Sequence, residues 1–440
     1  MKKTLLLIIV IGMCISIAAT FSLAGCKAEE GAAAETTAAA AETTAAATTE
    51  AVETITLDVW GQEDLQTFLE GGFTNINNAF MDKYPNIKIN YLWTFTHEKL
   101  STAMVANELP DCFVVFGDKT PVMGEMVKNN YLLALDNKID NLSRYTDADL
   151  EYGTVEGSLY CSPPSFFDAV IVFYNKDIFT TEGLSEPKTW DEFVNVCEQL
   201  KAKGITPLSM PGTDEWYRSW PVADFLATLA DEESINLMKG KGTFLEPAIV
   251  NAFQISRDFA ENGYFGKDYM AMDLDASILA FTNGKTAMAI DGTWQNVLYV
   301  EAGFDLGYFY LANNDGERIP LSSLSNITTY AVSAATEYPE QAALYINYLA
   351  NVEAQQMIED STGYVPSIAD IKPRDDTVKK MTEFDKLGTN MYTVCTAVSS
   401  EESQVNTIYI EEVVPKLLML EINGQEAAEL LQEALEAAQN

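Results

Sequence analysis

Strand and helix patterns alternate through the first third of the folded part of the chain, and this alternation restricts the fold more than any other feature. Residues 55–60 alternate apolar and polar side chains as a strand does, and residues 66–84 carry apolar side chains at helical spacing. Residues 87–93 predict a second strand, 99–107 a second helix, and 112–116 a nearly continuous apolar strand. This order predicts an open α/β sheet.

The same pattern starts again in the middle of the chain. Residues 170–174 are an apolar run, and Thr189 and Glu192 then form the signature of a capping box ahead of a helix that ends at Gly204. A chain of 440 residues is long enough for two domains of ordinary size. We therefore predict two lobes, each an open α/β sheet flanked by helices, with further long helices at residues 339–359 and 413–438.

The N-terminus has the pattern of a secretory signal. Lys2 and Lys3 precede an apolar run over residues 5–19, which is too short for a spanning helix. Residues 23–26 (LAGC) resemble the lipobox of bacterial lipoproteins, which implies a signal peptide over 1–25 and a diacylglycerol and a further acyl chain, such as palmitate, on Cys26. We expect an extracytoplasmic protein tethered to the outer face of a bacterial membrane, with a Gram-positive cell favoured.

Residues 26–52 consist almost entirely of Ala, Thr and Glu after the cysteine, with no apolar stripe to pack. We expect this segment to be a disordered linker that lifts the folded part off the lipid surface. The rest of the chain is rich in apolar and aromatic residues, as in a globular protein.

Charge and rare residues exclude several classes of function. The chain has 65 acidic and 27 basic residues and a formal net charge of −38, so nucleic acid and bare anionic membrane are poor partners. His97 is the only histidine, and no phosphate-binding glycine motif or HExxH occurs, so we predict no cofactor, no metal and no catalytic residue. The remaining cysteines contain no CxxC pair; we expect buried thiols, and their pairing stays open: Cys112, Cys161, Cys197 and Cys395.

Aromatic and acidic residues gather at predicted strand ends and turns. In open α/β sheets ligands bind outside the carboxyl ends of the strands, where several of these residues fall. Aromatic faces cover the C–H faces of a sugar, and carboxylates accept hydrogen bonds from its hydroxyls, although each aromatic taken singly also suits a core. The candidate ligand-binding residues from this pattern are Trp60, Glu63, Asp118, Asp168, Glu215, Trp216, Tyr217 and Trp294.

Several segments resemble extracellular solute-binding proteins of the sugar-transporter type. Residues 172–178 (VFYNKDI), 187–193 (PKTWDEF) and 200–205 (LKAKGI) resemble the family's sequence around the crossover into the second lobe. Residues 281–290 (FTNGKTAMAI) with 292–294 (GTW) resemble a hallmark whose Trp stacks on sugar, and 215–221 (EWYRSWP) a loop with a ligand-contacting Glu and Tyr.

The resemblance implies a two-lobed periplasmic-binding-protein fold of type II, the Venus-flytrap arrangement. The N-terminal lobe would be 53–167 with 326–371, and the C-terminal lobe 168–325 with 372–440. Crossings near 165–170, 324–329 and 368–375 would act as hinges.

Residue by residue, the resemblance implies ligand contacts from Asp118, Asp168, Glu215, Tyr217 and Trp294, and more loosely from Glu63. Residues 363–366 (GYVP) resemble a turn near the hinge, which adds Tyr364 to the candidates. The sequence departs from the family where residues 60–64 (WGQED) lack an Asp-Lys pair and where Lys119 replaces a binding Arg. The identity of the sugar therefore stays open.

These observations predict a monomeric receptor without enzymatic activity. It would bind a carbohydrate, an oligosaccharide first of all, and deliver it to the permease subunits of an ABC importer. One alternative is a binding protein for a cationic or peptide-like solute, with the acidic residues as charge partners. The other is a surface glycosidase or lyase, because the abundant acidic residues supply carboxylate pairs everywhere.

Overall fold

The computed structural model describes residues 53–117, 121–166, 168–322, 329–374, 376–400 and 402–439. Val52–Asn440 clusters as one compact unit, which is the part described below. The predicted signal peptide, linker and lipidated Cys26 lie outside the described residues, and so does Asp118. No helix in the described ranges is both long and apolar enough to cross a membrane.

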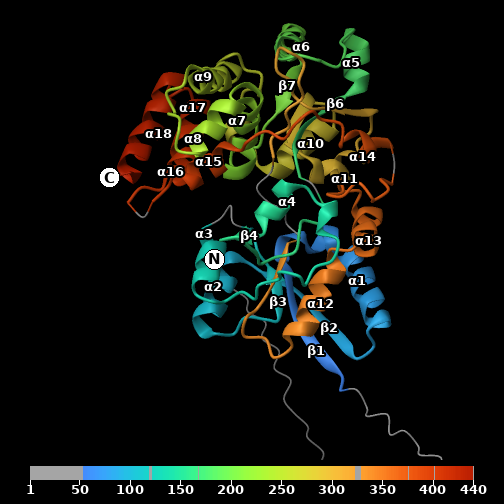
Figure 1. Cartoon of the computed structure of the whole chain (residues 1–440). Helices are drawn as coiled ribbons and strands as arrows, with labels where there is room; N and C mark the ends of the chain where they lie inside the picture. The colour runs from blue at the N-terminus through green and yellow to red at the C-terminus, as the bar shows by residue number, and fades with distance from the viewer. Residues whose placement is uncertain are drawn as a thin grey trace, which may run out of the picture. The chain divides into compact units, whose positions relative to one another are not determined.

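The first sheet confirms the predicted strand–helix alternation. Its strands are β1 (Ile55–Gln62), β2 (Ile87–Phe95), β3 (Cys112–Val114) and β10 (Tyr330–Val332), in the order β10-β3-β1-β2. β1 runs parallel to β2 and β3, whereas β10 is antiparallel to β3. α1 (Gln66–Lys83) and α2 (His97–Ala106) make the crossovers, as the periodicity predicts, and Figure 1 shows them beside the strands.

The second sheet is also mixed, but it does not repeat the three neighbouring parallel strands of the first. Its order is β7-β8-β6-β9, built from β6 (Val170–Asn175), β7 (Thr206–Ser209), β8 (Thr286–Gly292) and β9 (Leu306–Phe309). β7 is parallel to β8, but β6 is antiparallel to both β8 and β9. Every residue of β6 and β8 is buried, which explains their near-continuous apolar sequences.

Helices cover both sheets, with α6 and α10 packed against the second one (Figure 1). A short hairpin is formed by β4 (Thr154–Val155) and β5 (Ser158–Leu159). The further helices are α3 (Pro121–Lys128), α4 (Asp147–Tyr152), α5 (Lys176–Glu182), α6 (Trp190–Ala202), α7 (Glu215–Leu229), α8 (Asp231–Met238), α9 (Pro247–Glu261), α10 (Leu274–Thr282), α11 (Asn296–Tyr299), α14 (Asp376–Lys380), α15 (Met391–Ala397) and α16 (Val405–Thr407).

The start of α6 differs in detail from the predicted capping box. The Thr189 side chain accepts a hydrogen bond from the Glu192 backbone N–H at 3.3 Å, as predicted. The Glu192 carboxylate, however, accepts from the backbone N–H of Lys188 at 2.7 Å rather than from Thr189. Gly204 follows the helix with φ +77°, the left-handed conformation that glycine adopts without strain.

The two long helices predicted in the C-terminal part are each interrupted. Residues 339–359 form α12 (Pro339–Leu349) and α13 (Val352–Thr362), because the Asn351 side chain accepts from the Ala354 N–H at 3.0 Å and so starts a new helix. The segment 413–438 divides into α17 (Val414–Leu418) and α18 (Gly424–Ala438), with Leu420 in a left-handed conformation between them.

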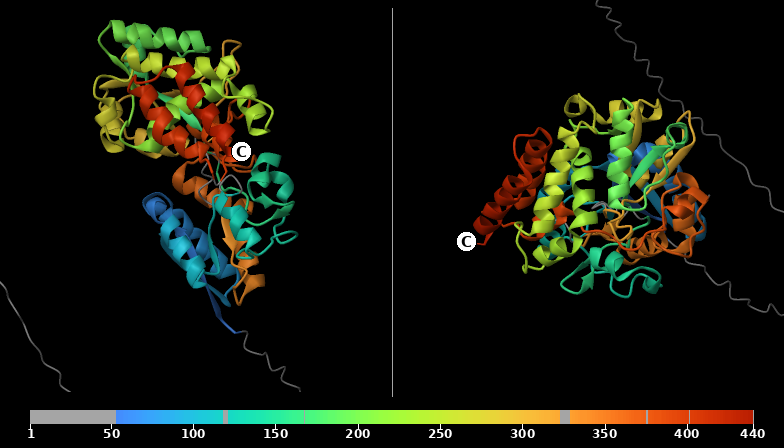
Figure 2. Two further views of the ribbon diagram at one scale, coloured as in Figure 1. Left: turned by 90° about the vertical axis from the view of Figure 1, so that its left-hand side faces the viewer. Right: turned by 90° about the horizontal axis from the view of Figure 1, so that it is seen from above.

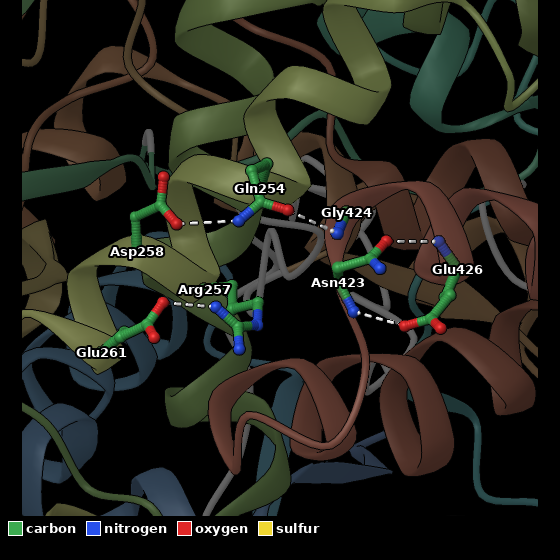
Figure 3. A network of polar contacts seen from close by, with 7 residues as sticks. All are labelled: Gln254, Arg257, Asp258, Glu261, Asn423, Gly424 and Glu426. Carbon is green, nitrogen blue, oxygen red and sulfur yellow. Dashed lines mark hydrogen bonds and ion pairs between the residues drawn. The ribbon is translucent and has the colours of Figure 1, made fainter.

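The N-terminus of α18 is held against α9 by a polar network (Figure 3). Asn423 and Glu426 form a reciprocal capping box, and the Gly424 N–H donates to the Gln254 side chain at 3.0 Å. A Cβ on Gly424 would lie 2.5 Å from backbone atoms of α9, so this close approach requires glycine. Figure 2 shows the C-terminal segment, in red, alongside α9.

Apolar side chains form separate cores around the two sheets. The first core collects residues from 57–166 and 330–364, and the second residues from 170–321 and 391–435. Isolated bridges pair Phe166 with Pro366 and Ala169 with Ser322, which places segments near the predicted crossings side by side. The exact lobe boundaries stay a prediction. Four cysteines lie buried and form no disulfide, as expected: Cys112, Cys161, Cys197 and Cys395.

We predict that Asn351→Ala lowers the free energy of unfolding by about 1 kcal/mol, because α13 loses its N-cap. Urea unfolding followed by circular dichroism measures the change. Asn78→Ala is the matched control: Asn78 is exposed within α1, where alanine is a better helix former, so this variant should be at least as stable as the parent. Equal stability of both variants would contradict the role of Asn351.

Candidate functional site

At one end of the second sheet, where β6 begins and β7 and β8 end, residues that are far apart in the sequence lie close together. Because β6 is antiparallel to β8, Val170 at the start of β6 pairs with Gly292 at the end of β8. The contact continues beyond the strands, since the Thr293 N–H donates to the Ala169 carbonyl at 2.9 Å. The segment before β6 and the segment after β8 therefore meet, which brings Asp168 and Trp294 to the same end of the sheet.

The third segment at this end of the sheet follows β7, which is parallel to β8 and so ends on the same side. It leads into α7, whose first turn carries Tyr217. The indole N–H of Trp294 donates to the Tyr217 hydroxyl at 3.3 Å, and the Gln295 side chain donates to the same oxygen at 3.4 Å. Trp294 and Tyr217 are thus direct partners.

Gly292 allows Trp294 to take this position. A Cβ on Gly292 would lie only 2.1 Å from the Trp294 ring, so the indole covers the backbone at the end of β8. Trp220 on α7 contacts the same indole edge-on, with ring centroids 6.1 Å apart. Trp294 is half-buried and packs against the apolar cores of both sheets.

Tyr364 approaches this group from the first core. Its side chain is buried and its ring lies 4.6 Å from that of Phe166. The bridge between Phe166 and Pro366 places Tyr364 beside the segment that leads to Asp168. Burial raises the pKa of Tyr364 above its usual range, and an ionised Asp168 or Tyr217 would raise it further. The structure therefore brings together four of the predicted residues: Asp168, Tyr217, Trp294 and Tyr364.

Asp168 is the most unusual member of the group. Its side chain is 2% exposed, and neither carboxyl oxygen has a hydrogen-bond partner among the described residues. Burial alone raises the pKa of Asp168 well above its usual value. A buried carboxylate with no donor is costly, so this position favours the neutral acid until a donor arrives.

Asp291 is a neighbour that sequence reasoning left unassigned, although it directly precedes Gly292 and Trp294. It is buried; one oxygen accepts from the Tyr299 hydroxyl at 2.6 Å and the other from the Gly292 N–H at 2.7 Å. Burial raises the pKa of Asp291 to about 7, and these two hydrogen bonds oppose the rise. Asp291 thus ties both ends of the segment that carries Trp294.

Two of the predicted residues, Trp60 and Glu63, lie outside this group. The ammonium of Lys99 lies 4.6 Å from the centroid of the Trp60 ring, and Glu63 is exposed in the short 3-10 helix Glu63–Leu65. No hydrogen bond or ring contact joins either residue to Trp294 or Tyr217 within the described ranges. Asp118 cannot be placed, because it lies outside the described residues.

Glu215 and Trp216, in the first turn of α7, are two further predicted residues that lie outside the group. Glu215 is exposed, and Trp216 is 38% exposed with its ring 4.8 Å from Tyr392. Trp216 reaches the group only through Trp220, at 6.4 Å between centroids. Among the residues that the structure describes, no cluster of three or more His, Cys, Asp or Glu is placed to hold a metal ion.

Comparisons with known proteins agree with this fold. The sequence profile of bacterial extracellular solute-binding proteins matches residues 75–386. An uncharacterized ABC transporter extracellular-binding protein of Pyrococcus horikoshii is 28% identical over 256 residues, which cover 55% of this chain and 57% of the relative. The multiple sugar-binding protein of Streptococcus mutans is 24% identical over 277 residues, which cover 60% of this chain and 64% of that relative. The chain thus spans less than two thirds of the length of these two relatives.

The structure also resembles a solved chitin oligosaccharide binding protein. The TM-score is 0.71 at 22% identity, and the match covers 88% of this chain and 99% of that chain. A likeness at this identity speaks for the fold alone, and it confirms the predicted two-lobed α/β fold.

We predict that Tyr299→Phe destabilises the protein more at pH 8 than at pH 5. Above pH 7 the variant removes a hydrogen bond to an ionised carboxylate, at a cost of about 1.5 to 3 kcal/mol. At pH 5 Asp291 is neutral in the folded state and the lost bond costs about 1 kcal/mol.

Urea unfolding at both pH values tests this expectation. Tyr310→Phe is the matched control, because the Tyr310 hydroxyl is buried and donates at 2.6 Å to the neutral carbonyl of Met381. Its cost should be the same at both pH values. A Tyr299→Phe cost that does not change with pH would show that the Asp291 carboxyl does not ionise in this range.

Proposed function

The chain belongs to the bacterial extracellular solute-binding protein family, and from this premise we propose that it is a lipid-anchored receptor that binds a sugar between its two lobes. It hands this sugar to the permease subunits of an ABC importer, and it acts as a monomer without catalysis. The observation that carries the proposal is the position of Trp294, which contacts both cores and bonds to Tyr217 beside an unpaired Asp168.

The chemistry of this group suits a polyhydroxylated ligand. An indole and two phenol rings offer flat apolar faces to the C–H faces of a sugar. Asp168 offers two oxygens that accept hydrogen bonds, and a pair of sugar hydroxyls supplies the donors that the described residues do not. The Tyr217 hydroxyl, which already accepts from Trp294 and Gln295, has its own proton left to donate to a ligand oxygen.

The names of the compared proteins point the same way. The Streptococcus mutans relative is named for binding multiple sugars, and the compared structure for binding chitin oligosaccharide. A sugar is therefore the ligand class that the relatives and the residues support together.

The arrangement in two lobes gives the receptor a way to signal its load. We propose lobes of residues 53–167 with 326–371 and of 168–325 with 372–440, joined by hinges near the three predicted crossings. Tyr364 comes from the first core and Tyr217 from α7 of the second. A ligand that touches both shifts the protein toward its closed state, and only such a ligand does so.

One observation favours a second candidate, a cationic solute. Asp168 has no cationic partner among the described residues, and an ammonium group would fill that role as well as hydroxyls do. Salt dependence separates the two candidates. Affinity for a cation should fall steeply as salt rises, whereas affinity for a neutral sugar should hardly change.

We predict that Trp294→Ala weakens sugar binding about tenfold or more, because one ring stack and its buried face are lost. Calorimetry on residues 52–440 against a panel of mono- and oligosaccharides measures this effect. Phe304→Ala is the matched control. Phe304 is half-buried and lies two residues before Leu306, which pairs with Asn175 at the far end of β6. It should bind as the parent does. Unchanged binding by Trp294→Ala would remove the assigned site.

The lipid anchor rests on the sequence of residues 23–26, which lies outside the described residues. We predict that Cys26→Ala moves the protein from the membrane fraction to the soluble fraction when the gene is expressed in a bacterium that processes lipoproteins. Labelling with a radioactive fatty acid should mark the parent and not the variant. A variant that stays in the membrane fraction would contradict anchoring through Cys26.

A further inference from the structure

Asp168 is buried at the meeting point of three segments, yet none of the described residues donates a hydrogen bond to its carboxyl group. It precedes β6, and its neighbour Ala169 is fixed by two hydrogen bonds with Thr293, so the backbone on this side is rigidly placed. Within the described residues, neither carboxyl oxygen has a hydrogen-bond partner, and no Lys or Arg forms an ion pair with Asp168.

The titratable groups around Asp168 are acidic or phenolic. Tyr364 of the first core and Tyr217 of α7 are close enough for an ionised Asp168 to raise the pKa of each phenol, and Asp291 at the end of β8 also raises the pKa of Tyr217. None of these groups carries a positive charge, and neither phenol donates a hydrogen bond to Asp168 within the described residues, so a negative charge on Asp168 is not offset by them. This surrounding differs from that of Asp291, which has two donors of its own.

An orphaned buried carboxyl destabilises the fold unless something completes it. In the empty receptor a proton completes it, since the neutral acid costs far less to bury than the ion. In the loaded receptor the hydroxyl groups of a sugar supply two donors, and hydrogen bonds to the charged form favour ionisation.

We propose that Asp168 couples ligand capture to the release of one proton. The carboxyl O–H bond breaks as two donors of the ligand reach the two oxygens, the negative charge stays on Asp168, and the proton passes to water. The inference rests on the proposed sugar-binding function, and it adds a specificity rule. Neutral polyols and cations bind, whereas ligands that present a phosphate or carboxylate to this point are rejected.

The coupling gives a definite pH dependence. Because binding releases a proton, affinity rises with pH, by up to tenfold per pH unit while Asp168 is protonated in the empty receptor. The sign is opposite for folding. The folded empty protein holds a proton that the unfolded chain has lost above pH 5, so its folding equilibrium falls by up to tenfold per unit as pH rises.

The first experiment needs no ligand. Unfolding of the parent and of Asp168→Asn is measured by urea from pH 5 to pH 8. The ratio of the folding constant of the variant to that of the parent should rise with pH, by up to tenfold per unit. Asp291→Asn is the control, because it removes a second buried acid at the same end of the sheet and keeps the contribution of Asp168. A ratio that stays flat with pH overturns the proposal, because Asp168 is then ionised in the empty protein.

The second experiment measures the proton directly. Calorimetric titrations with N,N′-diacetylchitobiose and with sucrose are run in two buffers of different ionisation enthalpy at one pH. For a sugar that binds, the difference in heat should correspond to about one proton released, and Asp168→Asn should release none. Binding with no buffer dependence overturns the coupling. Failure of every sugar in the panel contradicts the proposed function instead, and the ligand-free titration still decides whether Asp168 holds its proton.

Discussion

The antiparallel pairing of β6 with β8 is the constraint on which the candidate site depends. It places the beginning of one strand beside the end of the other, so that Asp168 and Trp294, more than a hundred residues apart in sequence, lie at one end of the sheet. In an all-parallel sheet the start of β6 would lie at the other end. The parallel strand β7 then delivers α7 and Tyr217 to the same side. The direction of three short strands thus assembles the group.

Burial of acidic groups without cations is the second theme of this site. A chain with 65 acidic and 27 basic residues keeps most of its charges in water, yet Asp168 and Asp291 are withdrawn from it. Asp291 is supported by Tyr299 and Gly292 and has a structural task, because it ties the Trp294 segment. Asp168 has no hydrogen-bond donor among the described residues, and this difference separates it from Asp291, whose carboxyl holds the fold.

The sequence predicted the strand–helix order well, because apolar periodicity reports directly on burial. It failed where a single polar side chain starts a new helix, as Asn351 does, since an asparagine within an apolar stripe does not alter the period. The start of α6 shows the same limit. Thr189 was correctly read as the cap, but whether Glu192 bonds to Thr189 or to Lys188 depends on backbone geometry.

For the site, residues next to strands of known direction were predictable, and the others were not. Asp168, Tyr217, Trp294 and Tyr364 come together, although their role in binding stays a prediction. Trp60 and Trp216 have the right residue type near strand ends and turns, but the ring of Trp60 is covered by Lys99 and that of Trp216 packs on Tyr392. The sequence does not single out Asp291, because an acid at the end of an apolar strand can be buried or exposed.

The contact between α9 and α18 has a consequence for how the protein matures. The second core is completed by residues 391–435, which pack on helices that precede them by well over a hundred positions. Contacts of such long sequence separation slow folding, because the intervening chain must be ordered before they form. During synthesis or passage through a translocation channel, the earlier helices of this core emerge with an uncovered apolar face, and that face stays open to chaperones and to aggregation until residues 424–438 follow.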